Sequence, residues 1–324
     1  MTASTGSCGI SAIAYALPEH RRSVRELDAL GQLTSDPAML EQFGFGQVYV
    51  AGEETPYSLA LAAATTLLRQ NAVSPASIET LLYCGTPSVA FAPAGRASEA
   101  SSRIASTRRF DYPATRLQYD LGLECASALA IDQLACTSLF SAVRIARALI
   151  ETGEARRVLC VSAEFFPECA GREAIYNCTS DAACAVLIDD SAERNRILAS
   201  AHVTKGYYWE GDARRNEIVA SYFPTAKHVI AETLRRAEWR SEDVTWVLPH
   251  NISVRSWEIL LGLTGIARER LWCRNIARVG HTLAGDNFIN LRDASEEGSV
   301  RPGDRLLLFS YGYGAHWTAL ALEA

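Results

Sequence analysis

The stretch Leu134-Ala135-Cys136-Thr137-Ser138-Leu139-Phe140 lies where a short apolar segment passes into a long amphipathic helix. Apolar side chains recur after it at helical spacing, at Leu139, Val143, Ala146 and Ile150. Gly153 ends this helix, and residues 157–162 form a buried strand. The pattern predicts a β-α-β unit that carries a cysteine at the start of its helix.

A cysteine at a helix start has a chemical use. The unpaired backbone N–H groups and the positive end of the helix dipole stabilise a thiolate over a thiol, and the same N–H groups can hold an oxyanion. Cys136 is therefore a candidate nucleophile. The alternative is that it fills the core, because the chain has nine cysteines and free cysteine is among the most buried residue types.

The cysteine pattern also bounds the environment of the protein. The count is odd, no pair has C-x-x-C spacing, and no charged-then-apolar leader precedes the first strand. We expect a reduced, cytoplasmic protein without disulfides, with no metal at Cys136 and no cofactor.

Composition excludes several classes of function. The 324 residues are 48% hydrophobic and 21% charged, which is enough for one large or two medium domains. No apolar run reaches the roughly 18 residues of a membrane span, and the net charge of −6 gives no general attraction to nucleic acid. We expect neither a nucleic-acid nor a membrane partner.

Strands and helices also alternate outside the first unit. Residues 10–16 read as a strand and 58–70 as a helix, and the second half repeats the style with a helix at 225–237, a strand at 244–248 and a helix at 286–296. Two α/β halves joined near residues 189–195 are the simplest arrangement, which divides the chain into residues 1–195 and 196–324. His250 and His281 each follow a buried segment of the second half, where α/β sheets place ligands.

Taken in order, the motifs form a family pattern. The chain resembles β-ketoacyl-acyl carrier protein synthase III and its relatives in the thiolase superfamily over nearly its whole length. The resemblance implies a thiolase-like fold, with two similar α/β halves in five αβαβα layers. The motifs that carry it are Tyr15-Ala16-Leu17-Pro18-Glu19, Thr34-Ser35-Asp36, Tyr112-Pro113-Ala114, Leu121-Gly122, Ala135-Cys136, Ser180-Asp181-Ala182-Ala183, Pro249-His250-Asn251, Gly280-His281-Thr282, and Tyr311-Gly312-Tyr313-Gly314 before Trp317.

The resemblance also implies roles for single residues. Cys136 matches the nucleophile that takes an acyl group from a thioester, and His250 matches the histidine that contacts the second substrate. The backbone N–H groups of Cys136 and Tyr313 match the oxyanion hole. The resemblance further implies that Tyr112 reaches across a homodimer to contact the substrate of the partner subunit. Substrate contacts are also implied for Tyr311, Gly312 and Gly314. Arg255 matches a residue that favours an acidic carrier protein.

Departures from the family pattern keep the reaction open. His281 stands where the synthase III pattern has asparagine, so Cys136, His250 and His281 form a Cys-His-His triad like that of the elongating ketoacyl synthases. Ala38 and Gln42 replace the tryptophan and arginine that grip the adenine of coenzyme A, which favours a carrier-bound donor over acyl-coenzyme A.

Three functions follow. The leading one is decarboxylative Claisen condensation of a Cys136-bound acyl group with a malonyl-type carrier thioester, in polyketide or fatty-acid-like specialised biosynthesis. The second is acyl transfer to a hydroxyl or amine, with His281 as general base. The third is a non-catalytic partner subunit, against which the retained Cys136, His250 and His281 argue.

Overall fold

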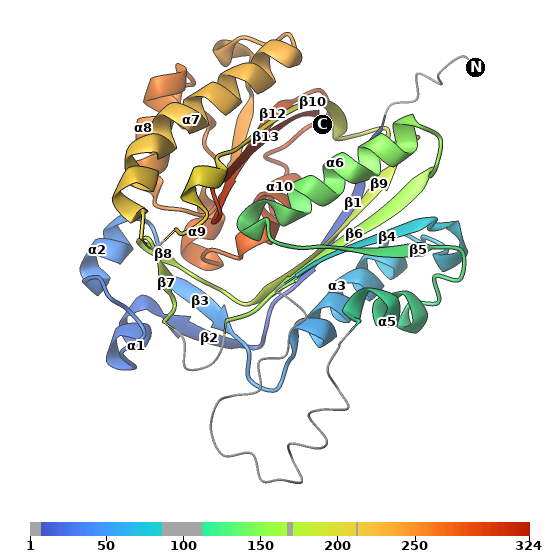
Figure 1. Ribbon diagram of the computed structural model, residues 1–324, viewed down its shortest axis with the longest axis horizontal. Coiled ribbons are helices and arrows are strands. Elements are labelled where there is room, and N and C mark those ends of the chain that lie inside the picture. Colours follow the sequence, from blue (N-terminus) through green and yellow to red (C-terminus); the bar gives the residue numbers. More distant parts are fainter. Residues whose placement is uncertain (1–7, 86–111, 167–170, 212) are drawn as a thin grey trace.

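Two runs of strands form the centre of the protein. The computed structural model describes residues 8–85, 112–166, 171–211 and 213–324 (Figure 1). The strands follow the order β5 (Ser127–Ile131), β4 (Thr80–Gly85), β6 (Arg157–Glu164), β9 (Ala182–Asp189), β1 (Gly9–Ala16), β10 (Arg196–Thr204), β13 (His316–Glu323), β12 (Arg305–Gly312) and β11 (Trp246–Pro249). The first five belong to one run and the last four to the other, and the runs join through a single register pair, Gly9 with Arg196.

The two runs repeat one pairing pattern. In the first, β4 pairs parallel with β6, and β9 and β1 then add antiparallel. In the second, β11 pairs parallel with β12, and β13 and β10 add antiparallel. The predicted division between residues 195 and 196 coincides with the start of β10 and stays a prediction as a domain boundary.

Helices lie on both sides of each run and between the runs, so that the molecule has the expected five layers (Figure 1). One outer layer packs on the first run, another packs on the second, and two helices fill the middle. In that order the helices are α3 (Pro56–Gln70) and α5 (Pro113–Asp120), then α7 (Arg215–Arg236) and α8 (Val254–Thr264), and in the middle α6 (Ser138–Glu151) and α10 (Asp286–Glu296).

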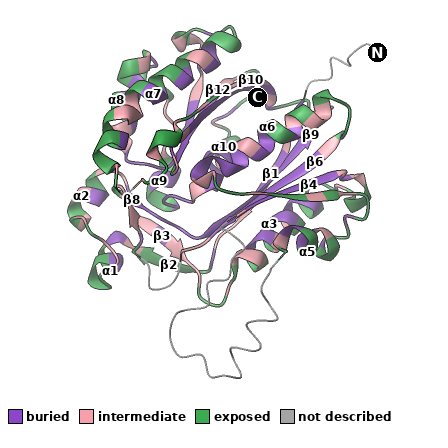
Figure 2. Cartoon of the chain, viewed as in Figure 1, coloured by how far each residue is buried: buried purple, intermediate pink, exposed green. Residues whose placement is uncertain are grey.

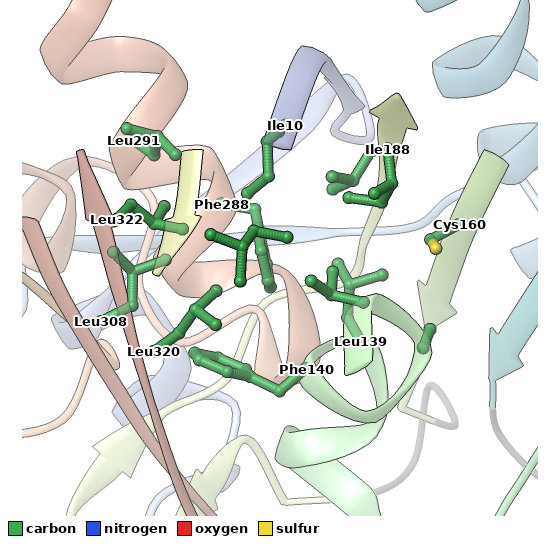
Figure 3. Close-up of a cluster of buried hydrophobic side chains, with 14 of the residues drawn as sticks. Ile10, Leu139, Phe140, Cys160, Ile188, Phe288, Leu291, Leu308, Leu320 and Leu322 are labelled. Atoms are coloured by element: carbon green, nitrogen blue, oxygen red, sulfur yellow. The ribbon is translucent and has the colours of Figure 1, made fainter. Parts of the chain in front are cut away.

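The central layer holds the main core. Phe140 of α6 and Phe288 of α10 meet with ring centroids 5.2 Å apart, and Leu308 and Leu320 from the second run pack against them (Figure 3). Figure 2 shows α10 and the central strands as largely buried, whereas α6 is buried along only part of its surface. Because side chains in such a core are close-packed, the ends of α6 and α10 are held at fixed positions.

Short elements connect the long strands and helices. They are β2 (His20–Ser23), α1 (Val24–Ala29), α2 (Pro37–Gln42), β3 (Gln47–Val50), β7 (Glu173–Ala174), β8 (Asn177–Cys178), α9 (Arg274–Arg278) and the 3₁₀ turns Pro75–Ser77, Ala135–Thr137, Gly206–Tyr208, Ser241–Asp243, Arg268–Arg270 and Leu283–Gly285. No helix within the described residues is long and apolar enough to cross a membrane.

Two predicted helices differ from the structure at their starts. Cys136 lies in the 3₁₀ turn just before α6 rather than in the helix itself. Helix α7 begins at Arg215 rather than at residue 225, because it continues through Pro224 and buries Ile218 about two turns before residue 225. The predicted helix 286–296 agrees with α10.

Candidate active site

Cys136 lies on a strained turn at the base of a cavity of about 430 Å³. The residue before it, Ala135, has a φ of 44°, and Gln133 has a φ of 66°. Side chains other than glycine rarely adopt this left-handed conformation, and each such residue costs on the order of 1 kcal/mol or more. The surrounding packing therefore holds the turn in place, and it leaves Cys136 only 5% exposed.

His281 faces the sulfur. Its Nε2 lies 3.5 Å from the Cys136 Sγ, and its Nδ1 lies 2.7 Å from the Asp286 Oδ2. Gly280 turns the chain into this position with a φ of 76°, and a Cβ there would crowd the Cys178 carbonyl. A thiol sulfur, an imidazole and an orienting carboxylate thus stand in line, as in catalytic triads generally.

Asp286 is the first residue of α10 and is completely buried. Besides His281 it accepts hydrogen bonds from the backbone N–H of Asn251 at 2.7 Å, and from the backbone N–H and hydroxyl of Thr282 at 2.6 and 2.7 Å. The position at a helix start and the hydrogen bonds both stabilise the carboxylate.

The two histidines are held in opposite protonation states. Burial alone would lower the pKa of His281, but the Asp286 carboxylate and the Cys136 sulfur outweigh it and raise that pKa to about 10. Burial, assisted by the neighbouring His281, lowers the pKa of His250 to about 3. Near neutral pH, His281 is therefore an imidazolium and His250 a neutral imidazole, a separation typical of acid and base pairs.

His250 follows β11 and is joined to the nucleophile by a hydroxyl. Its Nδ1 lies 2.9 Å from the Ser310 Oγ, and that oxygen lies 3.0 Å from the carbonyl oxygen of Cys136. The indole N–H of Trp257 donates to the His250 carbonyl at 2.8 Å, which fixes the backbone after the strand. The rings of His250 and His281 have centroids 4.6 Å apart.

The turn at residues 312–314 packs directly on the turn that carries Cys136. A Cβ at Gly312 would collide with the Leu134 carbonyl oxygen and would lie 3.3 Å from the backbone nitrogen of Cys136. Only glycine fits here, and this close approach places Tyr313 in the wall of the same cavity.

The other predicted site residues divide into two groups. Tyr311 and Arg255 line the cavity, and Arg255, which is 70% exposed, pairs with Glu258 at 3.1 Å. Tyr112, at the start of α5, is 65% exposed and is not among the lining residues, and neither is Gly314. Asp286, Ser310 and the lining residue Tyr222 were not predicted as site residues.

The cluster offers three atoms to a metal ion. The ligand atoms of Cys136, His250 and His281 lie within 4.8 Å of one another. However, the raised pKa of His281 retains its proton, and Asp286 occupies Nδ1, so a metal would have to displace a strongly held proton. The arrangement fits proton and acyl chemistry better than metal binding.

Comparison with known proteins identifies relatives of the chain. Two family models match, 3-oxoacyl-[acyl-carrier-protein] synthase III over residues 132–206 and its C-terminal part over residues 234–324. The β-ketoacyl-[acyl-carrier-protein] synthase III of Aquifex aeolicus is 28% identical over 302 residues, covering 90% of this chain and 91% of that protein, and the Erythrobacter litoralis enzyme is 26% identical over 310 residues, covering 88% and 90%.

Solved structures give the same result for the fold. The crystal structure of the Aquifex aeolicus synthase III superposes with a TM-score of 0.82 at 25% identity, covering 98% of this chain and all of that one. A priming β-ketosynthase from a polyketide biosynthetic pathway superposes with a TM-score of 0.79 at 19% identity, covering 98% and 96%. The chain belongs to the β-ketoacyl-[acyl-carrier-protein] synthase III family, with a thiolase-like fold and a Cys-His-His group in its cavity.

Proposed function

We propose that this protein transfers an acyl group through a thioester on Cys136 and joins it to a malonyl-type carrier thioester by decarboxylative Claisen condensation. The observation that carries the proposal is the 3.5 Å contact between the Cys136 sulfur and His281, which Asp286 holds protonated. The membership in a family of condensing enzymes supports it.

The first half-reaction loads the enzyme. The Cys136 thiolate attacks the donor thioester carbonyl, and the oxyanion is held by the backbone N–H groups of Cys136 and Tyr313. The carbon–sulfur bond to the donor breaks, and the leaving thiolate takes its proton from His281. The acyl group then remains on Cys136, with His281 neutral.

The second half-reaction forms the carbon–carbon bond. The malonyl carboxylate leaves as carbon dioxide, and its electron pair becomes the enolate of the acceptor thioester. The enolate carbon attacks the acyl carbonyl, and Cys136 leaves as a thiolate. The mostly apolar cavity wall favours loss of charge from the carboxylate.

One observation favours a second candidate, acyl transfer to a hydroxyl or amine. The Ser310 hydroxyl has one proton, and the Cys136 carbonyl beside it only accepts. If that proton goes to the carbonyl, His250 donates from Nδ1 to Ser310, and its Nε2 presents a lone pair to the cavity. A neutral Nε2 can take the proton of an alcohol or amine as it attacks the acyl group.

Several finer features belong to the proposal. We infer that the donor comes on an acyl carrier protein, since Arg255 stands exposed at the cavity wall and Ala38 and Gln42 offer coenzyme A no stacking face or cation. We also infer a homodimer, in which Tyr112 reaches the partner's cavity, and a role in polyketide or fatty-acid-like specialised biosynthesis.

Intact-protein mass spectrometry with carrier-bound and coenzyme A-bound acyl donors tests the loading step. We expect the acyl mass on the parent and on Cys160→Ala, a matched control for a cysteine buried in the core, and not on Cys136→Ala. Equal loading of Cys136→Ala would refute the nucleophile, and no loading of any variant would favour the non-catalytic subunit. Labelled carbon dioxide from carboxyl-labelled malonyl carrier then separates the candidates, because heteroatom transfer releases none.

A further inference from the structure

Two tyrosines place hydroxyl groups in the apolar wall of the cavity. Tyr222 of α7 and Tyr311 of β12 both line it, and their rings meet nearly perpendicularly, at 89°, with centroids 5.5 Å apart. Both phenol oxygens are buried, and neither has a hydrogen-bond partner among the described residues. Buried polar groups without partners are rare in native proteins and carry a free-energy penalty, so each calls for a reason.

Both hydroxyls are donors. Burial raises the pKa of Tyr222, and the neighbouring Tyr311 adds to the effect. Burial also raises the pKa of Tyr311, with further contributions from Tyr313 and from the sulfur of Cys136. The two groups therefore stay protonated, and Tyr311 lines the same cavity as Cys136.

The surroundings define what these donors would bind. Ile218, Val219 and Phe223 line the same wall on α7, and none of them offers an acceptor. A charged oxygen would need a compensating cation in this wall, whereas an uncharged oxygen needs only the hydroxyl protons. The phenol oxygens are shielded from water.

We propose that Tyr222 and Tyr311 select a substrate chain that carries an uncharged oxygen, a hydroxyacyl or oxoacyl group rather than a plain alkyl group. The proposal rests on the acyl-transfer function above, whose substrate class it specifies. The chain can be that of the donor or that of the acceptor, since both pass through the cavity at Cys136.

Unreactive ligands test the preference separately from catalysis. Amide analogues of butyryl-, 3-hydroxybutyryl- and 3-oxobutyryl-pantetheine, in which NH replaces the thioester sulfur, would be titrated calorimetrically. We expect the parent to bind an oxygenated analogue about 10-fold more tightly than the alkyl one, as for a site built around one hydrogen bond. Tyr222→Phe and Tyr311→Phe should each reduce this ratio and the double variant should abolish it.

Tyr15→Phe is the matched control, because Tyr15 donates to Asp293 at 3.0 Å and does not line the cavity. It should keep the parent's ratio. The corresponding thioesters would be tested in two ways, as donors that load Cys136 and as acceptors of the acetyl group from acetyl-loaded enzyme. The assay in which the oxygenated compounds are preferred shows whether the donor or the acceptor carries the oxygen. A preference for oxygenated amides without any loading would refute acyl transfer and keep the selection. If Cys136 is loaded but the parent and the Phe variants share the same ratio of affinities for oxygenated and alkyl amides, selection by the two tyrosines is refuted and acyl transfer is kept.

Discussion

Replacement of Asp286 by asparagine should change the protonation of His281 while keeping a side chain of nearly the same size at this position. The carboxylate holds the pKa of His281 at about 10 against the effect of burial, which alone would place it below the ordinary 6.5. One pKa unit corresponds to about 1.4 kcal/mol, so the amide forfeits up to about 5 kcal/mol of preference for the imidazolium.

We expect single-turnover loading of Asp286→Asn at pH 7 to be slower by roughly 10⁴-fold, as when the carboxylate of a triad becomes an amide. The parent rate should stay level as the pH rises and fall only near pH 10, where His281 loses its proton. The variant should lose this level profile, because His281 no longer supplies a paired imidazolium.

The same substitution has a consequence for stability with a defined sign. His281 has a raised pKa in the folded protein. Its contribution to the free energy of unfolding is therefore complete below pH 6.5 and is lost as the pH rises toward 10. Asp293→Asn, on the same helix but hydrogen-bonded to Tyr15, is the control and should keep the parent profile. A variant with a level profile and a rate within a few-fold of the parent would refute the role given to Asp286.

Three further outcomes are expected. Because burial lowers the pKa of His250 to about 3, the free energy of unfolding should fall by up to about 1.4 kcal/mol per pH unit between pH 6.5 and 3, and His250→Gln should flatten that fall in denaturant titrations. Gly312→Ala should lose loading by more than roughly 100-fold and should melt lower, because its Cβ collides with a carbonyl oxygen, whereas Gly262→Ala, which meets nothing, should load normally. Arg255→Glu should lower kcat/KM for carrier-bound donors about 10-fold and leave that for pantetheine thioesters unchanged, and equal loss for both would contradict carrier docking.

The sequence predicted the fold well because its signals are local. Alternating strand and helix patterns give the β-α-β order, and the acidic residue and apolar spacing at the start of α10 mark that helix to the residue. The start of α7 was missed because Pro224 looks like the beginning of a helix. Ile218, which precedes Pro224, is buried against the second run of strands, and this packing extends the helix to residues before the proline. Tertiary packing decided that boundary.

The site was predictable in part for the same reason. Cys136, His250 and His281 occupy ends of helices and strands that a sequence pattern can locate. Asp286 and Ser310 reach the histidines through contacts that the folded chain creates. In the sequence Asp286 looks like an ordinary helix start, and Ser310 looks like an interior residue of a strand. No spacing rule connects them to the cysteine.

The contacts of His281 also explain how one residue could serve both halves of a ping-pong reaction. In the free enzyme its pKa is raised by two partners, the Asp286 carboxylate and the Cys136 sulfur. Acylation removes the charge of the sulfur and its hydrogen bond but leaves the carboxylate, so the imidazolium gives up its proton more readily once the leaving thiol needs it. When Cys136 is released as a thiolate, the raised pKa returns and His281 recovers a proton. The triad therefore resets itself with either a carbon or a heteroatom acceptor. In the proposed reaction, the choice between them falls to His250 with its Ser310 partner.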